Sequence, residues 1–184
     1  KIADNHKVLS STIFEKILSK FKTELTQKFS NLEIFSLFRT NKKILLYLFN
    51  EEILLPDLDI YNIIREGKYE GQNYLGYFFI EFESFLTEEF KQKIKYSDLV
   101  KDIDLFKKKR LEGHNDSYIC TIIRNDEVED FITYLNKTNL SFNSIIPDSL
   151  FESNPFVLKQ QMTLIEYAAY CGSIQVFQYL KIKG

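Results

Sequence analysis

The sequence is poor in residues that interrupt regular structure, with six glycines and three prolines among 184 residues. An all-β sandwich needs a turn about every 8–12 residues, so this scarcity argues against one. Cysteine is scarce as well, and two cysteines cannot form the disulfide framework typical of a small secreted domain. We therefore expect a protein of a reducing compartment, with an intracellular, cytoplasmic location.

Neither a basic excess nor a long apolar run is present. The formal net charge is −2, with charges of both signs mixed along the chain, whereas bulk affinity for nucleic acid or an anionic membrane requires a basic excess. The longest apolar runs, "ILLYLF" and "YFFI", are far shorter than the roughly 18 residues that span a bilayer. These features predict no nucleic-acid partner and no membrane insertion.

Histidine is also scarce, and only His6 and His114 are available for catalysis or metal binding. A Ser–His–Asp or Cys–His site needs a histidine beside its nucleophile, and neither histidine has a sequence context that suggests this. The short paired spacing of a zinc finger and a glycine-rich phosphate loop are also absent from the sequence. We expect a non-catalytic protein without cofactor, metal or small-molecule substrate.

What the sequence does contain is helical periodicity. Hydrophobic residues make up 45% of the chain, enough for a folded core. Near the start, one apolar residue recurs every four positions, which predicts one stripe of a long amphipathic helix. The stripe consists of Leu9, Ile13, Ile17, Phe21, Leu25 and Phe29, flanked by Val8, Phe14 and Leu18.

Polar residues that favour helix starts divide the following region. Ser30 or Asn31 suits the start of one helix, and Thr40 or Asn41 that of the next. Pro56 fits the first turn of a third helix. Further helices are predicted over residues 77–94, with a break near Thr87, and over residues 97–110.

Two short stretches of this region allow two interpretations each. "LPDLDIYNII" (Leu55–Ile64) resembles the opening of an F-box, which would recruit a ubiquitin ligase. It also fits a helix that begins at a proline and buries Ile60, Ile63 and Ile64. The basic run Lys107–Arg110 fits a solvated helix end, favoured by the helix dipole, or a nuclear-localisation signal.

After Gly113 the chain repeats a design of helix, tight turn and helix. The two copies are "ICTIIRNDEVEDFITYL" and "IEYAAYCGSIQVFQYL", with turns at Asp126 and Gly172, 46 positions apart and differing by one residue in length. The intervening residues form an inserted segment. We expect a helical N-terminal region over residues 1–112 and helical repeats over residues 113–184.

The last copy has a regular set of features. A capping box begins its first helix, two small residues allow close helix packing, one glycine permits the turn and another ends the second helix. These residues are Thr163 and Glu166, Ala168 and Ala169, Gly172, and Gly184. The pattern resembles an ankyrin repeat, although Leu164 and Glu166 stand where that family usually has proline and histidine.

A wider resemblance covers the chain from about Lys28 to the end. The stretches from Phe29, Asn115 and Thr163 are similar to protist ankyrin-repeat proteins that carry an uncharacterised helical region ahead of the array. This resemblance implies an all-α fold in which ankyrin-like helix-turn-helix repeats begin an α-solenoid. It also implies a longer array, of which these residues are the front part.

The resemblance further implies a protein-interaction scaffold with an unknown protein partner. By motif position, the partner-binding residues are Lys159, Gln160, Met162, Tyr170 and Cys171, and we expect Met162 and Tyr170 to be partly exposed. The alternatives are a substrate adaptor of a ubiquitin ligase and an enzyme with an unrecognised site.

Overall fold

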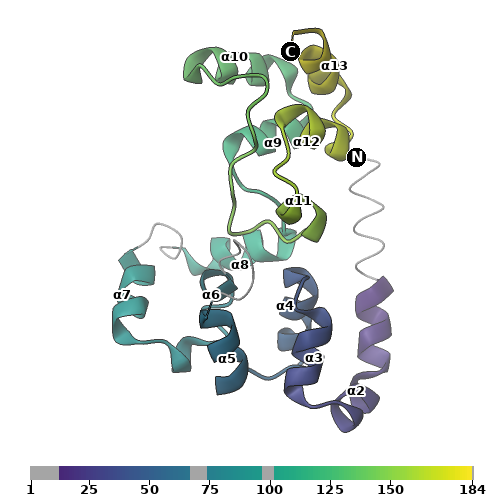
Figure 1. The fold of residues 1–184 in the computed structure, drawn as a ribbon, viewed down its shortest axis with the longest axis vertical. Coiled ribbons are helices and arrows are strands. Elements are labelled where there is room, and N and C mark those ends of the chain that lie inside the picture. The colour runs from purple at the N-terminus through teal and green to yellow at the C-terminus, as the bar shows by residue number, and fades with distance from the viewer. Residues whose placement is uncertain (1–12, 67–73, 97–101, 184) are drawn as a thin grey trace. The chain divides into compact units, whose positions relative to one another are not determined.

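The structure is a computed structural model that describes residues 13–66, 74–96 and 102–183, with the backbone alone for 93–96. The all-α prediction is confirmed, since the described residues form helices and a single isolated bridge, between Ile145 and Thr163 (Figure 1). Two compact units result. The N-terminal unit comprises Ile13–His114 with Ser153–Pro155, and the hairpin unit comprises Asn115–Glu152 and the chain from Phe156 onward.

The N-terminal unit is built from short helices whose starts are capped by side chains. Ser30 forms a capping box with Glu33, Asn41 accepts the amide of Ile44, and Asp57 accepts the amide of Ile60. Pro56 therefore precedes a cap instead of lying in a first turn. The helices are 13–20, α2 (Lys22–Lys28), α3 (Asn31–Phe38), α4 (Lys42–Asn50), α5 (Leu58–Arg65), α6 (Tyr74–Tyr77), η1 (Glu83–Phe85), α7 (Glu88–Tyr96) and α8 (Ile103–Glu112).

The long amphipathic helix expected at the start is wrong in two respects. It is interrupted at Phe21, which separates the helix over 13–20 from α2. The predicted stripe is also largely exposed, whereas Leu18, beside it, is buried. The side that packs is fixed by the Tyr47 hydroxyl, which donates to the Glu15 carbonyl at 2.9 Å and bonds the Ser19 hydroxyl. Leu9 and Val8 lie outside the described residues.

The core of the N-terminal unit is aromatic and contains cations. Lys42 is 1% exposed, and its ammonium lies 5.5 and 5.2 Å from the ring centroids of Tyr74 and Tyr77. The Arg110 guanidinium lies 5.3 Å from the Tyr77 ring and donates to both carboxylate oxygens of Glu81, at 3.0 and 2.6 Å. A solvated helix end is thus wrong for Arg110, because α8 turns Phe106 and Arg110 to the core and leaves Lys107 exposed.

The hairpin unit contains two helical hairpins whose first helices and turns coincide at an offset of 46. They are α9 (Tyr118–Asn125) with α10 (Val128–Thr138), and α12 (Leu164–Cys171) with α13 (Ile174–Lys183). Both turns pass through a left-handed residue, Asp126 at φ 60° and Gly172 at φ 72°. The turns are equal in length, contrary to the predicted difference. Instead, the buried positions of the second helices differ. Leu180 of α13 is buried in the place of Leu135 of α10, although it comes one position earlier than the offset of 46 predicts.

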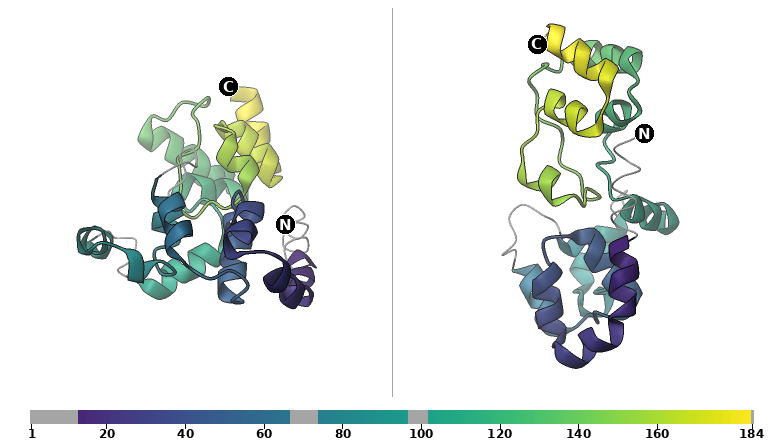
Figure 2. Two further views of the ribbon diagram at one scale, coloured as in Figure 1. Left: turned by 60° about the horizontal axis from the view of Figure 1, so that its bottom comes forward. Right: turned by 90° about the vertical axis from the view of Figure 1, so that its right-hand side faces the viewer.

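The two hairpins stack, with α12 against α9 and α13 against α10 (Figure 2). Asp126 caps α13 from the neighbouring hairpin, because its carboxylate oxygens accept the amides of Gln175 and Val176 at 3.1 and 3.0 Å. The Ser173 hydroxyl donates to the Ile123 carbonyl. A common apolar core lies between the hairpins and includes Ile119, Cys120, Ile123, Phe131, Leu164, Tyr167, Ala168, Val176 and Leu180.

Hydrogen bonds of polar side chains hold the inserted segment between the hairpins in place. The buried Glu152 carboxylate accepts the Asn115 amide at 3.1 Å, and the Asn115 side chain donates to the Pro147 carbonyl at 2.6 Å. Ser149 donates to Asp116 at 2.8 Å. The segment also contains α11 (Pro155–Lys159) and returns to α12 through the bridge at Thr163.

Gly113 ends α8 in the left-handed region at φ 68°. Its carbonyl accepts both the amide and the hydroxyl of Ser153, at 3.2 and 2.9 Å. A side chain at this position would collide with the Ser153 hydroxyl and would be strained at this φ. Glycine is therefore required where the chain leaves the N-terminal unit.

Candidate protein-interaction surface

The residues predicted to bind a partner divide between surface and core. Lys159 and Gln160 are exposed at the end of α11, and Tyr170 and Cys171 are half-buried at the end of α12. Met162 is 4% exposed, so the prediction of an exposed Met162 is wrong. Its carbonyl accepts the Ile146 amide at 2.9 Å, and this pairing of the inserted segment with itself directs the thioether into the hairpin core.

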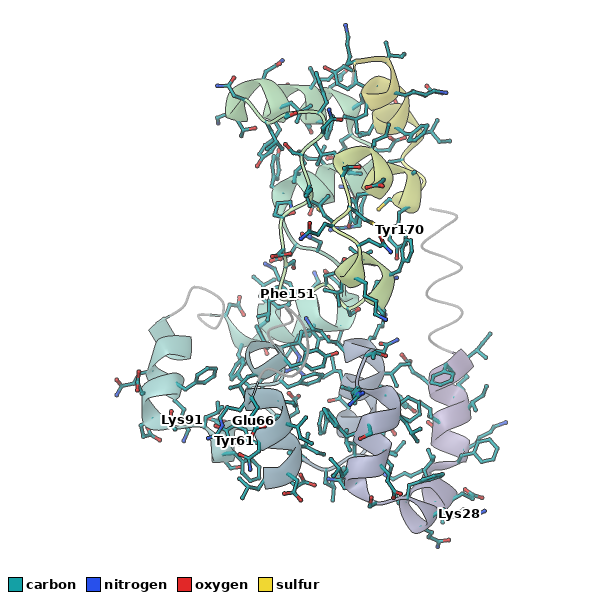
Figure 3. The ribbon with its side chains drawn as sticks, in the orientation of Figure 1. Lys28, Tyr61, Glu66, Lys91, Phe151 and Tyr170 are labelled. Carbon is teal, nitrogen blue, oxygen red and sulfur yellow. The ribbon has the colours of Figure 1, made fainter. Side chains whose placement is uncertain are left out.

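Tyr170 belongs to a series of three aromatic rings on α11 and α12. The Phe156 and Tyr170 ring centroids are 6.0 Å apart and those of Tyr170 and Tyr167 are 6.2 Å apart, with interplanar angles of 30° and 29°. Phe156 is 55% exposed, Tyr170 half-buried and Tyr167 buried. Tyr170 lies beside α11 (Figure 3). The series thus runs from the core to solvent, and we name Phe156, Tyr170, Lys159 and Gln160 the aromatic surface.

The base of this series is held rigidly. The Tyr167 hydroxyl accepts a hydrogen bond from the Arg124 guanidinium at 3.0 Å, and Arg124 also donates to the Asn115 carbonyl and the Thr121 hydroxyl. Burial raises the pKa of Tyr167 far above its usual value, so it stays neutral. The hydrogen bond from Arg124 holds the Tyr167 ring in place beneath Tyr170, and a contact ring that packs on an ordered neighbour loses less entropy when it meets a partner.

The two small residues of α12 differ in environment. Ala168 is fully buried against the first hairpin, whereas Ala169 is exposed. The expectation that Ala169 needs a small side chain for close helix packing is therefore wrong, and Ala168 has that position. Thr163 and Glu166 form a capping box, and Gly172 turns the chain. Gly184 lies outside the described residues.

The cysteines and the candidate metal ligands are the remaining residues of chemical interest. Cys120 is fully buried, and burial raises the pKa of its thiol to about 11, which leaves the thiolate negligible at neutral pH. No group of three or more His, Cys, Asp or Glu side chains among the described residues could hold a metal ion. His6 lies outside those residues. No described helix has the length and apolar character to traverse a bilayer.

The F-box-like stretch, Leu55–Ile64, contains both exposed and buried apolar residues. Leu55 and Leu58 are 56% and 57% exposed, whereas Ile60 and Ile64 are buried and Ile63 is partly so. The helix begins at the Asp57 cap, as an ordinary amphipathic helix does. The two exposed leucines are the part of the stretch that lies on the surface of this unit.

The sequence matches no family model, and no curated protein or solved structure is similar to it. The function must therefore be argued from the chain's own geometry. Sequence reasoning missed Phe156, the most exposed member of the aromatic surface. Phe156 and Val157 are adjacent apolar residues of a short helix that buries Val157 and leaves Phe156 exposed, and the sequence carries no signal for which of the two faces solvent.

Proposed function

We propose that the chain is a non-catalytic protein-interaction scaffold of the ankyrin-repeat type, acting inside the cell through the aromatic surface of its hairpin unit. The observation that carries the proposal is the exposed Phe156 ring beside Tyr170, which stacks on Tyr167, the tyrosine that Arg124 hydrogen-bonds. Large aromatic side chains are enriched in protein interfaces, and an ordered one loses little entropy on binding.

The surroundings of the two rings support a polar rim. Lys159 and Gln160 are exposed beside Phe156 and can donate hydrogen bonds to a partner's carboxylate or carbonyl groups. An interface with an aromatic centre and a polar, solvent-accessible border is the common arrangement in protein complexes. The resemblance of α12–α13 to an ankyrin repeat adds to this support.

The proposal is tested by affinity purification from the native cell with three forms of the chain. The wild type is compared with Phe156→Ala/Tyr170→Ala, and with Tyr118→Ala as control. Tyr118 is an exposed tyrosine of the same unit that lies outside the aromatic surface. We expect one set of proteins to be recovered with the wild type and the control and to be lost with the double variant.

Recovery of the same proteins with all three forms would contradict the proposal. Circular dichroism of the double variant decides whether a loss reflects binding or folding. Both side chains are exposed or half-exposed, so we expect the helical signal and the unfolding midpoint to stay near those of the wild type.

A further inference from the structure

The N-terminal unit has two exposed apolar surfaces of opposite charge. The first, which we name the basic surface, lies on the helix over 13–20 and its end. Ile13, Ile17 and Phe21 are 45–55% exposed there. Residues 13–28 contain four lysines and two glutamates, and Lys16 and Lys20 follow Ile13 and Ile17 by three positions, so that each lies beside one of them on the helix.

The exposure of the basic surface is not explained by a loosely held helix. The helix buries Leu18, beside these residues, and bonds Tyr47 through the Glu15 carbonyl and the Ser19 hydroxyl; the Lys22 ammonium donates to the Glu51 carbonyl at the end of α4. The helix is therefore fixed on one side, and its apolar residues on the other side are presented to solvent. Neighbouring exposed apolar side chains of this size indicate an interaction site.

The second surface, which we name the acidic surface, lies where α3 and α5 begin. Leu32, Leu55 and Leu58 are all exposed. The Asn31 side chain joins their two segments, because it donates to the Leu55 carbonyl at 2.6 Å and accepts the Leu55 amide at 2.9 Å. Glu33 and Asp59 lie in the first turns of these two helices and Asp57 caps α5, so the charges nearest the three leucines are carboxylates.

We infer that a second copy of this chain covers these surfaces, with the basic surface of each copy on the acidic surface of the other. Three apolar residues lie on each surface, and the charges that border them are opposite in sign. Lys16, Lys20 and Asp59 form no ion pair with another described residue, so their charges are available to a partner.

A twofold arrangement uses both surfaces of both copies. The two surfaces are close together in the chain, since α2 ends at Lys28 and α3 starts at Asn31. A self-complementary pairing forms the contact between basic and acidic surface twice, and a twofold axis is the commonest symmetry of homodimers. It thereby approaches the roughly 1,200–2,000 Å² that stable interfaces bury, which one surface of three side chains does not provide.

Sedimentation velocity of the full chain tests the inference through a charge exchange. One variant is Lys16→Glu/Lys20→Glu and the other is Asp59→Lys. In a homodimer of either variant, like charges meet at both contacts, and we expect the dissociation constant to rise by about tenfold or more. In an equimolar mixture, both contacts again join opposite charges, and we expect dimers of one copy of each variant to re-form.

The matched control is Lys107→Glu/Lys108→Glu, which reverses two exposed lysines of α8 and should leave the dissociation constant unchanged. Restoration in the mixture also shows that the variants are folded. A wild-type chain that is monomeric up to about 100 µM, well above a micromolar dissociation constant, would overturn the inference. So would a dimer that the exchange variants do not weaken, or a monomer whose Leu55 and Leu58 instead bind a ubiquitin-ligase subunit.

Discussion

The two units place their buried polar groups in different ways. In the hairpin unit, buried polar side chains bond the backbone at turns and loop ends: Ser173 bonds the Ile123 carbonyl, and Glu152 bonds the Asn115 amide. In the N-terminal unit, buried cations lie inside the core itself. Lys42 lies over tyrosine rings, and Arg110 pairs with Glu81.

Buried polar groups at turns and buried ion pairs affect stability differently. A polar group that caps a turn satisfies a backbone donor or acceptor that would otherwise be unpaired, and its neighbours remain apolar. A buried ion pair must recover the desolvation of two charges, which well-packed apolar residues of similar volume would avoid. The hairpin unit should therefore tolerate loss of one polar group better than the N-terminal unit does.

The largest expected effect comes from breaking the buried pair. Arg110→Met leaves the Glu81 carboxylate, 12% exposed, without its partner, and we expect the free energy of unfolding in urea to fall by about 3–5 kcal/mol. Lys108→Met removes an exposed cation from the same helix and should change it by less than about 0.5 kcal/mol. Equal effects of the two substitutions would mean that the buried pair does not stabilise the N-terminal unit.

A smaller effect is expected from the packing of α12. Ala168→Leu inserts three carbon atoms into the interface between the hairpins and should cost about 1–3 kcal/mol in thermal or urea unfolding. Ala169→Leu places the same side chain on the exposed side and should stay within about 0.5 kcal/mol. The reverse order would mean that α12 presents its other side to α9.

The next effect concerns Asp126, which forms the turn of the first hairpin and caps a helix of the second. Asp126→Ala removes the cap of α13 and leaves a Cβ in a left-handed conformation, so we expect a loss of about 1–2 kcal/mol in unfolding free energy. Asp126→Gly removes the same cap without the steric cost and should lower the unfolding free energy by less than Asp126→Ala does. If alanine and glycine were equivalent, the strain at this turn would be negligible.

The smallest effect concerns the capping box of α12. Hydrogen bonds from the Thr163 amide and hydroxyl hold the pKa of Glu166 below its usual 4.5. Because the pKa of Glu166 is lower in the folded protein than in the unfolded chain, its ionised carboxylate stabilises the fold. This stabilisation is complete above about pH 4.5 and is lost as pH falls through the folded pKa.

Glu166→Gln should therefore be less stable than the wild type at pH 7, and the difference in unfolding free energy should narrow below pH 4.5. Glu129→Gln, at an exposed position in the first turn of α10, controls for the loss of one carboxylate. A difference that stayed constant down to pH 2 would exclude the capping bonds as its source.

Sequence reasoning succeeded where a structural feature depends on neighbours in the chain. The caps at Ser30 and Asn41 and the turns at Asp126 and Gly172 are local, and their residue types are selective for those positions. The hairpins followed from the same local signals together with helical periodicity.

It failed where distant residues decide the outcome. Arg110 appeared to end a helix in solvent, and only its meeting with Glu81, 29 positions away, makes it part of the core. Met162 is buried because residues near Ile146 pair with the chain beside it. The exposed side of the first helix could not be predicted either, since its periodicity fits two sides and Tyr47 determines which one packs.

The bond between Ser153 and the Gly113 carbonyl bears on the order in which the protein is made. Residues 40 positions apart must meet before the N-terminal unit has all of its contacts. At 5–20 residues per second, a ribosome needs about 2–8 s to add that intervening stretch, which contains the complete first hairpin. During synthesis the first hairpin is therefore translated while the N-terminal unit still lacks its last segment, so that unit receives its last contacts only after part of the hairpin unit has left the ribosome.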